Sequence, residues 1–116
     1  MEKHAINPWA GECTLILNGT PRVLKLTLGS LAQMEQALSN GSLVELVERF
    51  ESGVFSAQDV QAVIIAGLRG GGWRGEASTL LDAEIAGGPL EATRIAAQLL
   101  VRAFASPAAL SAGAAQ

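Results

Sequence analysis

The chain has 116 residues, enough for one domain with a hydrophobic core, and it carries a net charge of −3. Hydrophobic residues make up 49% and charged residues only 16%, which excludes an intrinsically disordered chain. An acidic chain without clustered Lys and Arg argues against nucleic acid as a partner. The single cysteine, Cys13, cannot form an intrachain disulfide and indicates a reducing cytoplasm. The sequence shows neither a signal peptide nor an apolar run long enough to cross a bilayer, so we expect no membrane partner.

Residues 12–28 alternate in a way that predicts a β-hairpin. Its turn is Asn18-Gly19, because both residues accept positive φ. A two-residue loop at this point pairs Leu17 with Thr20. Two strands alone are marginally stable in water, so helices must cover the apolar face of the hairpin. Six residues share that face in this register: Cys13, Leu15, Leu17, Leu24, Leu26 and Leu28.

Three capping boxes predict three short helices after the hairpin. In each box a serine caps the helix, and a polar residue three positions later reaches back to it. We expect the third helix, which runs from Ser56 to the glycines at 70–72, to be central because its body is almost entirely apolar or small. Glycines end a helix readily because they adopt the left-handed C-cap geometry. The three pairs are Ser30/Gln33, Ser42/Glu45 and Ser56/Asp59.

A short helix from Thr79 to Ala86 and a last helix from Pro89 to about Phe104 are predicted next. The last helix is apolar on more than one face. Ile95 and Leu99 lie off the stripe that we assign to the core, so they are our candidate residues for self-association or for binding a partner protein. Trp73, in the glycine-rich link before these helices, is the alternative. The stripe assigned to the core is Leu90, Ala97, Leu100, Val101 and Phe104.

Together these elements predict an α+β fold that is mainly helical, with an N-terminal β-hairpin followed by four to five short helices. We expect residues 11–106 to form a single domain. Residues 1–10 have no periodicity and are expected to be a flexible arm. Residues 107–116 are rich in Ala, Ser and Gly and are expected to be a disordered tail.

No pattern in the chain indicates a catalytic or metal site. His4 and Cys13, the only histidine and cysteine, cannot by themselves form a zinc site or a nucleophile pair. The glutamates at 45, 48 and 51 alternate with an apolar stripe, which is typical of a solvated helix face. The stretch RGGGWRG, residues 69–75, has the glycines to cradle a phosphate and the Trp73 ring to stack on a base. It follows a helix rather than a strand, however, and it occurs once in an acidic chain, so we interpret it as a flexible link.

The sequence nevertheless resembles a known family. The segments LKLTLGSLAQMEQAL (24–38) and SLVELVERFESGVFSAQDVQAVIIAGLRGGG (42–72) are similar to small tail proteins encoded in phage-derived gene transfer agent clusters and related prophages. The resemblance covers roughly two-thirds of the chain and brings no catalytic residues with it. It is carried by two motifs, L-x-L-T-L-G, which starts at Leu24, and E-R-F-x-S-G-x-F-S-A-x-D-V, which starts at Glu48.

The family is grouped with phage tail assembly chaperones and has also been labelled a tail tube protein. The resemblance therefore implies a non-enzymatic role in tail morphogenesis, without cofactor or small-molecule substrate. One reading is a cytoplasmic chaperone that binds the tape-measure protein until tube subunits polymerise around it. The other is a structural subunit that stays in the particle. On either reading Trp73, Ile95 and Leu99 are the residues expected to contact the tape-measure protein, another tail protein or a second copy of the chain.

Overall fold

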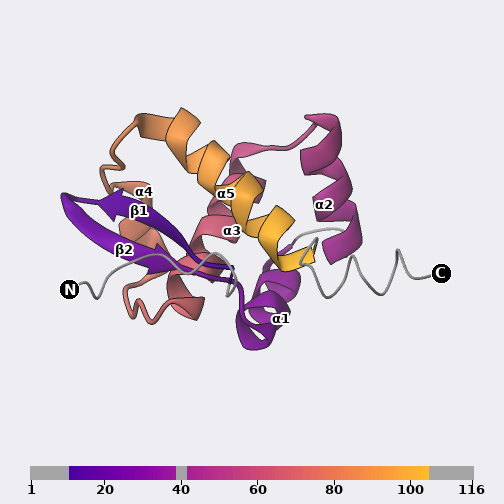
Figure 1. The fold of residues 1–116 in the computed structure, drawn as a ribbon, viewed down its shortest axis with the longest axis horizontal. Coiled ribbons are helices and arrows are strands. Elements are labelled where there is room, and N and C mark those ends of the chain that lie inside the picture. Colours follow the sequence, from indigo (N-terminus) through magenta and orange to yellow (C-terminus); the bar gives the residue numbers. More distant parts are fainter. Residues whose placement is uncertain (1–10, 39–41, 105–116) are drawn as a thin grey trace.

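A computed structural model describes residues 11–38 and 42–104 of the chain. The arm expected at 1–10 and the tail expected at 107–116 lie outside the described residues. The hairpin followed by helices confirms the predicted α+β, mainly helical class (Figure 1). The elements in chain order are β1 (Cys13–Leu17), β2 (Thr20–Leu24), α1 (Leu28–Ala37), α2 (Leu43–Ser52), α3 (Ala57–Gly70), α4 (Ala77–Leu81) and α5 (Gly88–Phe104).

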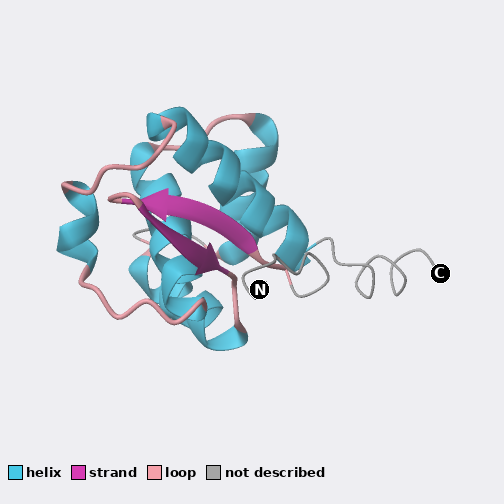
Figure 2. Cartoon of the chain, turned by 60° about the vertical axis from the view of Figure 1, so that its left-hand side comes forward, coloured by secondary structure: helices cyan, strands magenta, loops and turns pink. Residues whose placement is uncertain are grey.

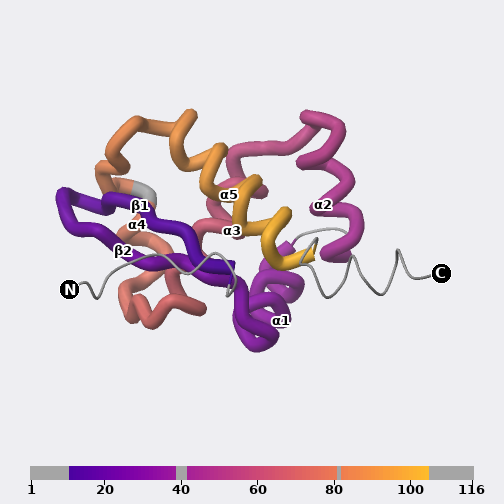
Figure 3. The backbone as a smooth tube through the Cα atoms, viewed as in Figure 1, coloured from indigo at the N-terminus to yellow at the C-terminus, as the bar shows by residue number. Residues whose placement is uncertain are grey.

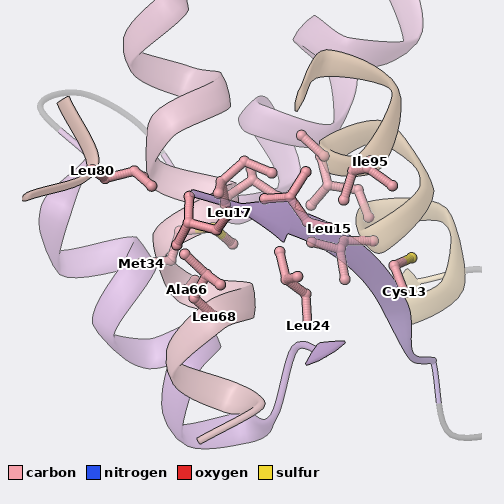
Figure 4. Packing of buried hydrophobic residues seen from close by; sticks show 14 of the residues in the cluster. Cys13, Leu15, Leu17, Leu24, Met34, Ala66, Leu68, Leu80 and Ile95 are labelled. Carbon is pink, nitrogen blue, oxygen red and sulfur yellow. The ribbon is translucent and has the colours of Figure 1, made fainter. Parts of the chain in front are cut away.

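Helix α3 is the central element, as its composition predicts. Helices α1 and α5 and strand β2 all pack against it, and the hairpin lies over the helices on one side (Figure 2). The core that forms between them is aliphatic. Figure 4 shows the hairpin side chains Leu15, Leu17 and Leu24 directed into the same cluster as Leu68 and Ile95.

The hairpin has the predicted turn and register. Leu17 pairs with Thr20, and both turn residues have positive φ, 51° at Asn18 and 82° at Gly19. Its inward face is buried as expected from Cys13 to Leu24. The expectation that this face continues to Leu28 is wrong, because β2 ends at Leu24 and Leu28 is 84% exposed. Leu28 instead begins a helix.

Two of the three predicted capping boxes are confirmed, at Ser42/Glu45 and Ser56/Asp59. The first box is wrong. Thr27 caps α1, its Oγ1 accepts a hydrogen bond from Ser30 N (3.1 Å), and Ser30 Oγ accepts one from Thr27 N (2.8 Å). Thr27 and Ser30 have the same spacing as the predicted pair but lie three residues earlier. Helix α1 therefore starts at Leu28, earlier than predicted.

The short helix predicted from Thr79 to Ala86 is present, but its predicted end is wrong, because α4 spans Ala77–Leu81. The following segment returns along the outer edge of β1 (Figure 3). Ile85 bridges to Leu17, Asn18 N donates to Glu84 O (2.7 Å), and Ala86 N donates to Ile16 O (3.1 Å). Pairing with the strand edge satisfies backbone groups that would otherwise need water, and it outweighs the local helix propensity.

Helix α5 is rotated relative to the prediction. Leu90, Val101 and Phe104, which we expected to face inward, are 81%, 61% and 40% exposed. Ile95 and Leu99, which we placed outside the core, are only 2% and 1% exposed. The buried face of α5 consists of Ala92, Ile95, Ala96, Leu99 and Leu100.

Small residues at the contact between α5 and α3 determine this rotation. Ala92 and Ala96 lie on the buried face of α5 and allow it to approach α3 closely. Gly67 on α3 serves the same purpose, since a Cβ at that position would lie 2.7 Å from Leu99 Cδ1. Close approach of helix backbones through small side chains increases the dispersion contacts of the whole interface.

The glycines at the end of α3 pack against β2 and do not form the start of a loose link. A Cβ on Gly70 would lie 1.9 Å from Lys25 O, and one on Gly71 would lie 1.8 Å from Val23 O. Lys25 N donates to Gly67 O (3.0 Å) in the same contact. The predicted end of the helix at the glycines is confirmed. The interpretation of this stretch as flexible is wrong for Gly70 and Gly71, because the helix end and the strand touch backbone to backbone.

Candidate partner-binding groove

An open groove runs between α2 and α5. One hollow of about 270 Å³ lies between Val47 and Phe50 of α2 and Leu100, Val101 and Phe104 of α5. A second hollow of about 260 Å³ shares Val47, Glu51 and Phe104 with the first and extends it to Val44 and Glu48. We call the two hollows together the α2–α5 groove.

The spacing of its residues gives the groove two straight walls. On α2 the wall residues are Val44, Val47, Glu48 and Glu51, which recur at i, i+3, i+4 and i+7 and so lie on one helix face. On α5 the wall residues Ala97, Leu100, Val101 and Phe104 have the same spacing. Seven residues of helix rise about 10 Å, so each wall is about two turns long.

The groove exposes apolar surface that a soluble monomer normally buries. Val44 is 65% exposed, Val101 is 61% exposed and Phe104 is 40% exposed. Contiguous exposed apolar side chains rimmed by polar residues are typical of a protein–protein interface. The groove therefore has the character of a binding surface.

Helix α2 is fixed to α3 by a partly buried ion pair between Arg49 and Asp59. Arg49 Nε donates to Asp59 Oδ2 and Arg49 Nη2 to Asp59 Oδ1, both at 2.9 Å. Asp59 Oδ2 also accepts from Ser56 N (3.0 Å) as part of the capping box. The hydrogen bonds from Arg49, helped by those within the capping box, lower the pKa of Asp59 despite its burial. The pair thus sets the position of the α2 wall from the first turn of α3.

An aromatic stack reinforces this junction. The rings of Phe50 and Phe55 lie 4.6 Å apart and nearly parallel, at 7°. Such pairs contribute about 0.5–1.5 kcal/mol beyond their buried area. Phe50 therefore packs at the corner after α2, and its side chain also lines the α2–α5 groove.

The two walls of the groove differ in charge. Glu48 and Glu51 are exposed on the α2 wall, whereas the α5 wall is wholly apolar. Among the described residues, no Lys or Arg lines either hollow. Neither carboxylate has a cationic partner within residues 11–38 and 42–104. The groove is therefore acidic on one side only.

A family model described as phage tail tube protein, GTA-gp10, matches residues 10–106. The chain belongs to this family. No curated protein matches the chain, and no solved structure matches it. The resemblance found in the sequence is thus confirmed, and the α2–α5 groove is a surface of a tail protein of phages and gene transfer agents.

Further hollows open on the described part of this tail protein. One of about 310 Å³ lies between α3, α4 and α5, beside Ile64, Leu80 and Ala92. Another, of about 440 Å³, is polar and lies beside Trp73 and the start of α1. Trp73 is half-buried there, so its role in binding a partner stays a prediction. The capping box of Thr27 and Ser30 already uses a backbone amide of α1 that a phosphate would need.

Cys13 of the tail protein is a core residue. Burial raises the pKa of its thiol, which disfavours the nucleophilic thiolate. Arg102 of α5 contacts Cys13 Sγ at 3.4 Å and donates to Glu12 O, so it ties the start of β1 to α5. Among the described residues, no three acidic, histidine or cysteine side chains gather as metal ligands. No helix in this part of the chain has the length and apolarity to span a membrane.

The structure does not bring the three candidate residues of the sequence together. Ile95 and Leu99 lie in the core, where a partner cannot reach them in the folded protein, and Trp73 lies beside a separate polar hollow. The α2–α5 groove was missed. Its one sequence signal is Val44, an apolar residue on the same helix face as Glu48 and Glu51, which we expected to be entirely solvated.

Proposed function

We propose that the chain is a tail assembly chaperone that binds a helix of the tape-measure protein in the α2–α5 groove. The observation that carries this proposal is an open apolar groove with two helical walls on a tail protein. A groove of this kind accepts the apolar face of an amphipathic helix. The tape-measure protein is long and helical, and its apolar stripes need cover in the cytoplasm until tube subunits assemble around it.

The edges of the hairpin favour this function over a tube subunit built by joining sheets. Such a tube needs free strand edges on each subunit. The outer edge of β1 already pairs with the segment around Ile85. Strand β2 carries Pro21, which has no backbone N–H to offer a neighbouring strand, and its end packs against Gly70 and Gly71 of α3.

The second candidate function is a structural subunit retained in the particle. The description of the family as a phage tail tube protein favours it. In that case the α2–α5 groove would receive a helix of a neighbouring tail subunit. Mass spectrometry of purified particles separates the two functions, because a chaperone is absent from finished particles and a subunit is present in them in many copies.

Val101→Glu tests the site directly. Val101 is 61% exposed on the groove wall, so we expect the variant to fold with an unchanged circular dichroism spectrum and nearly unchanged melting temperature. A carboxylate in the apolar wall should weaken co-purification with the tape-measure protein at least about tenfold, since a desolvated unpaired charge is costly. Leu90→Glu is the matched control, because Leu90 lies on the same helix, is 81% exposed and lines neither hollow of the groove.

If Val101→Glu binds the tape-measure protein as tightly as the parent does, the groove is not the binding site. Equal losses in Val101→Glu and Leu90→Glu would have the same consequence, because they would indicate a general effect of charge on α5. Failure of the parent protein itself to bind the tape-measure protein would reject the chaperone function.

A further inference from the structure

We infer that the α2–α5 groove selects a basic amphipathic helix, one whose apolar stripe is flanked on a single side by Lys or Arg. The inference rests on the proposed function, because it takes the groove as the binding surface. It adds the chemistry of the partner helix. The inference starts from the asymmetry of the two walls.

The apolar part of the groove fixes the stripe. Val47, Phe50, Leu100 and Val101 line its first hollow, and each wall is about 10 Å long. A helix that covers both walls needs apolar side chains at i, i+3 or i+4, and i+7, which is the spacing of the walls themselves. Two to three turns of the partner are enough.

The acidic part of the groove fixes the flank. Glu48 and Glu51 are three residues apart on α2, so their carboxylates project from one face, one turn apart. Both lack a cationic partner in the described part of the chain. Lys or Arg residues one turn apart on a bound helix would lie opposite them, whereas an acidic flank would be repelled.

The same charges argue against a second copy of the chain as occupant. A two-fold symmetric dimer places the same surface on both subunits. If the groove were that surface, Glu48 and Glu51 of both protomers would enter one interface, and their mutual repulsion would not be offset, because no described residue that lines the groove is Lys or Arg. A partner of opposite charge avoids this repulsion.

Three synthetic helical peptides test the inference. All have the same leucine stripe, flanked on one side by Lys, on one side by Glu, or on both sides by Lys. Their binding is measured by fluorescence anisotropy at about 0.05 M and about 0.5 M salt, where the Debye length falls from over 10 Å to about 4 Å. The double variant Glu48→Gln/Glu51→Gln removes the acidic wall. Glu35→Gln/Glu76→Gln is its control, with the same change of charge at two exposed residues outside the groove.

We expect the parent and the control to bind the one-sided Lys peptide about tenfold more tightly than the Glu peptide at low salt, since two exposed ion pairs replace two repulsions. The preference should fall below about twofold in Glu48→Gln/Glu51→Gln and at high salt. Lys on the second side should add less than about twofold, because the α5 wall has no carboxylate. Equal binding of the Lys and Glu peptides to the parent would overturn the inference, and so would a preference that survives in the double variant.

The two proposals fail separately. If the Lys preference is found while the tape-measure protein does not bind, the selectivity of the groove stands and the chaperone function is rejected. If Val101→Glu abolishes binding of the tape-measure protein but the peptides show no preference, the chaperone function stands and the proposed selectivity of the groove is rejected. Sedimentation of the chain alone gives a third result, because a dimer that Val101→Glu dissociates would identify a second copy as the occupant and overturn the inference.

Discussion

Replacing Gly70 with alanine tests whether the end of α3 packs against the backbone at Lys25, directly after β2. A Cβ at this position would lie 1.9 Å from Lys25 O, and real Cβ contacts are essentially never shorter than 3.0 Å. The helix end or the strand must therefore move by about 1.1 Å. That movement strains the hydrogen bond from Lys25 N to Gly67 O, now 3.0 Å long, and loosens the packing of Leu24.

The expected change in the free energy of unfolding is the sum of three contributions. Overpacking costs about 1–3 kcal/mol, and a lost hydrogen bond costs about 0.5–1.5 kcal/mol. Alanine has a higher helix propensity than glycine, which stabilises the variant by up to about 1 kcal/mol. We therefore expect Gly70→Ala to lower the free energy of unfolding by about 2–3 kcal/mol, or roughly 10–20 °C in melting temperature for a domain of this size.

Urea unfolding followed by circular dichroism measures this loss. Gly29→Ala is the control, because Gly29 also lies in a helix but its Cβ would meet only Thr27 Oγ1, at an ordinary 4.0 Å. We expect Gly29→Ala to be as stable as the parent or slightly more stable. If Gly70→Ala is also as stable as the parent, then the backbone contact between α3 and β2 is absent and this part of the fold is wrong.

Two further predictions follow from buried residues. Leu99→Glu should unfold the protein, because an unpaired charge in the core costs about 3–5 kcal/mol; a variant with the parental spectrum and melting temperature would contradict the burial of Leu99. Asp59→Asn should change how stability depends on pH. Arg49 holds the folded-state pKa of Asp59 below its unfolded value, so the carboxylate stabilises the fold above about pH 4 and this contribution is lost as the pH falls further. Urea midpoints between pH 2 and pH 6 should therefore fall more steeply for the parent than for the variant, and parallel curves would refute the role of the ion pair.

Local signals in the sequence predicted much of the fold. The hairpin turn depends on Asn18 and Gly19 alone, and the starts of α2 and α3 depend on serines and acidic residues three positions apart, so neighbouring residues suffice to place them. The first capping box failed because Thr27 and Ser30 offer the same chemistry one turn earlier than the predicted pair. Pattern alone does not rank two overlapping boxes.

Contacts between distant residues account for the other errors. The segment around Ile85 pairs with Leu17, and no local pattern predicts a partner that far away along the chain. The rotation of α5 is a similar case, because Leu90, Val101 and Phe104 have helical spacing just as good as that of the buried face. The close contact of Leu99 with Gly67 determines which face of α5 is buried. This contact can be recognised only when α3 and α5 are placed together. The groove was missed for the same reason, since its two walls come from different helices.

During synthesis, β1 must wait for the segment around Ile85 before its outer edge can be paired. The hairpin can form as soon as its own residues leave the ribosome, but the hydrogen bond from Glu84 N to Asn18 Oδ1 joins residues 66 positions apart. At about 5–20 residues per second, the ribosome needs roughly 3–13 s to make that intervening chain. For that interval the outer edge of β1 is uncovered and can pair with other nascent chains. We therefore expect slow codons between β1 and α5 to lower the soluble yield of the protein.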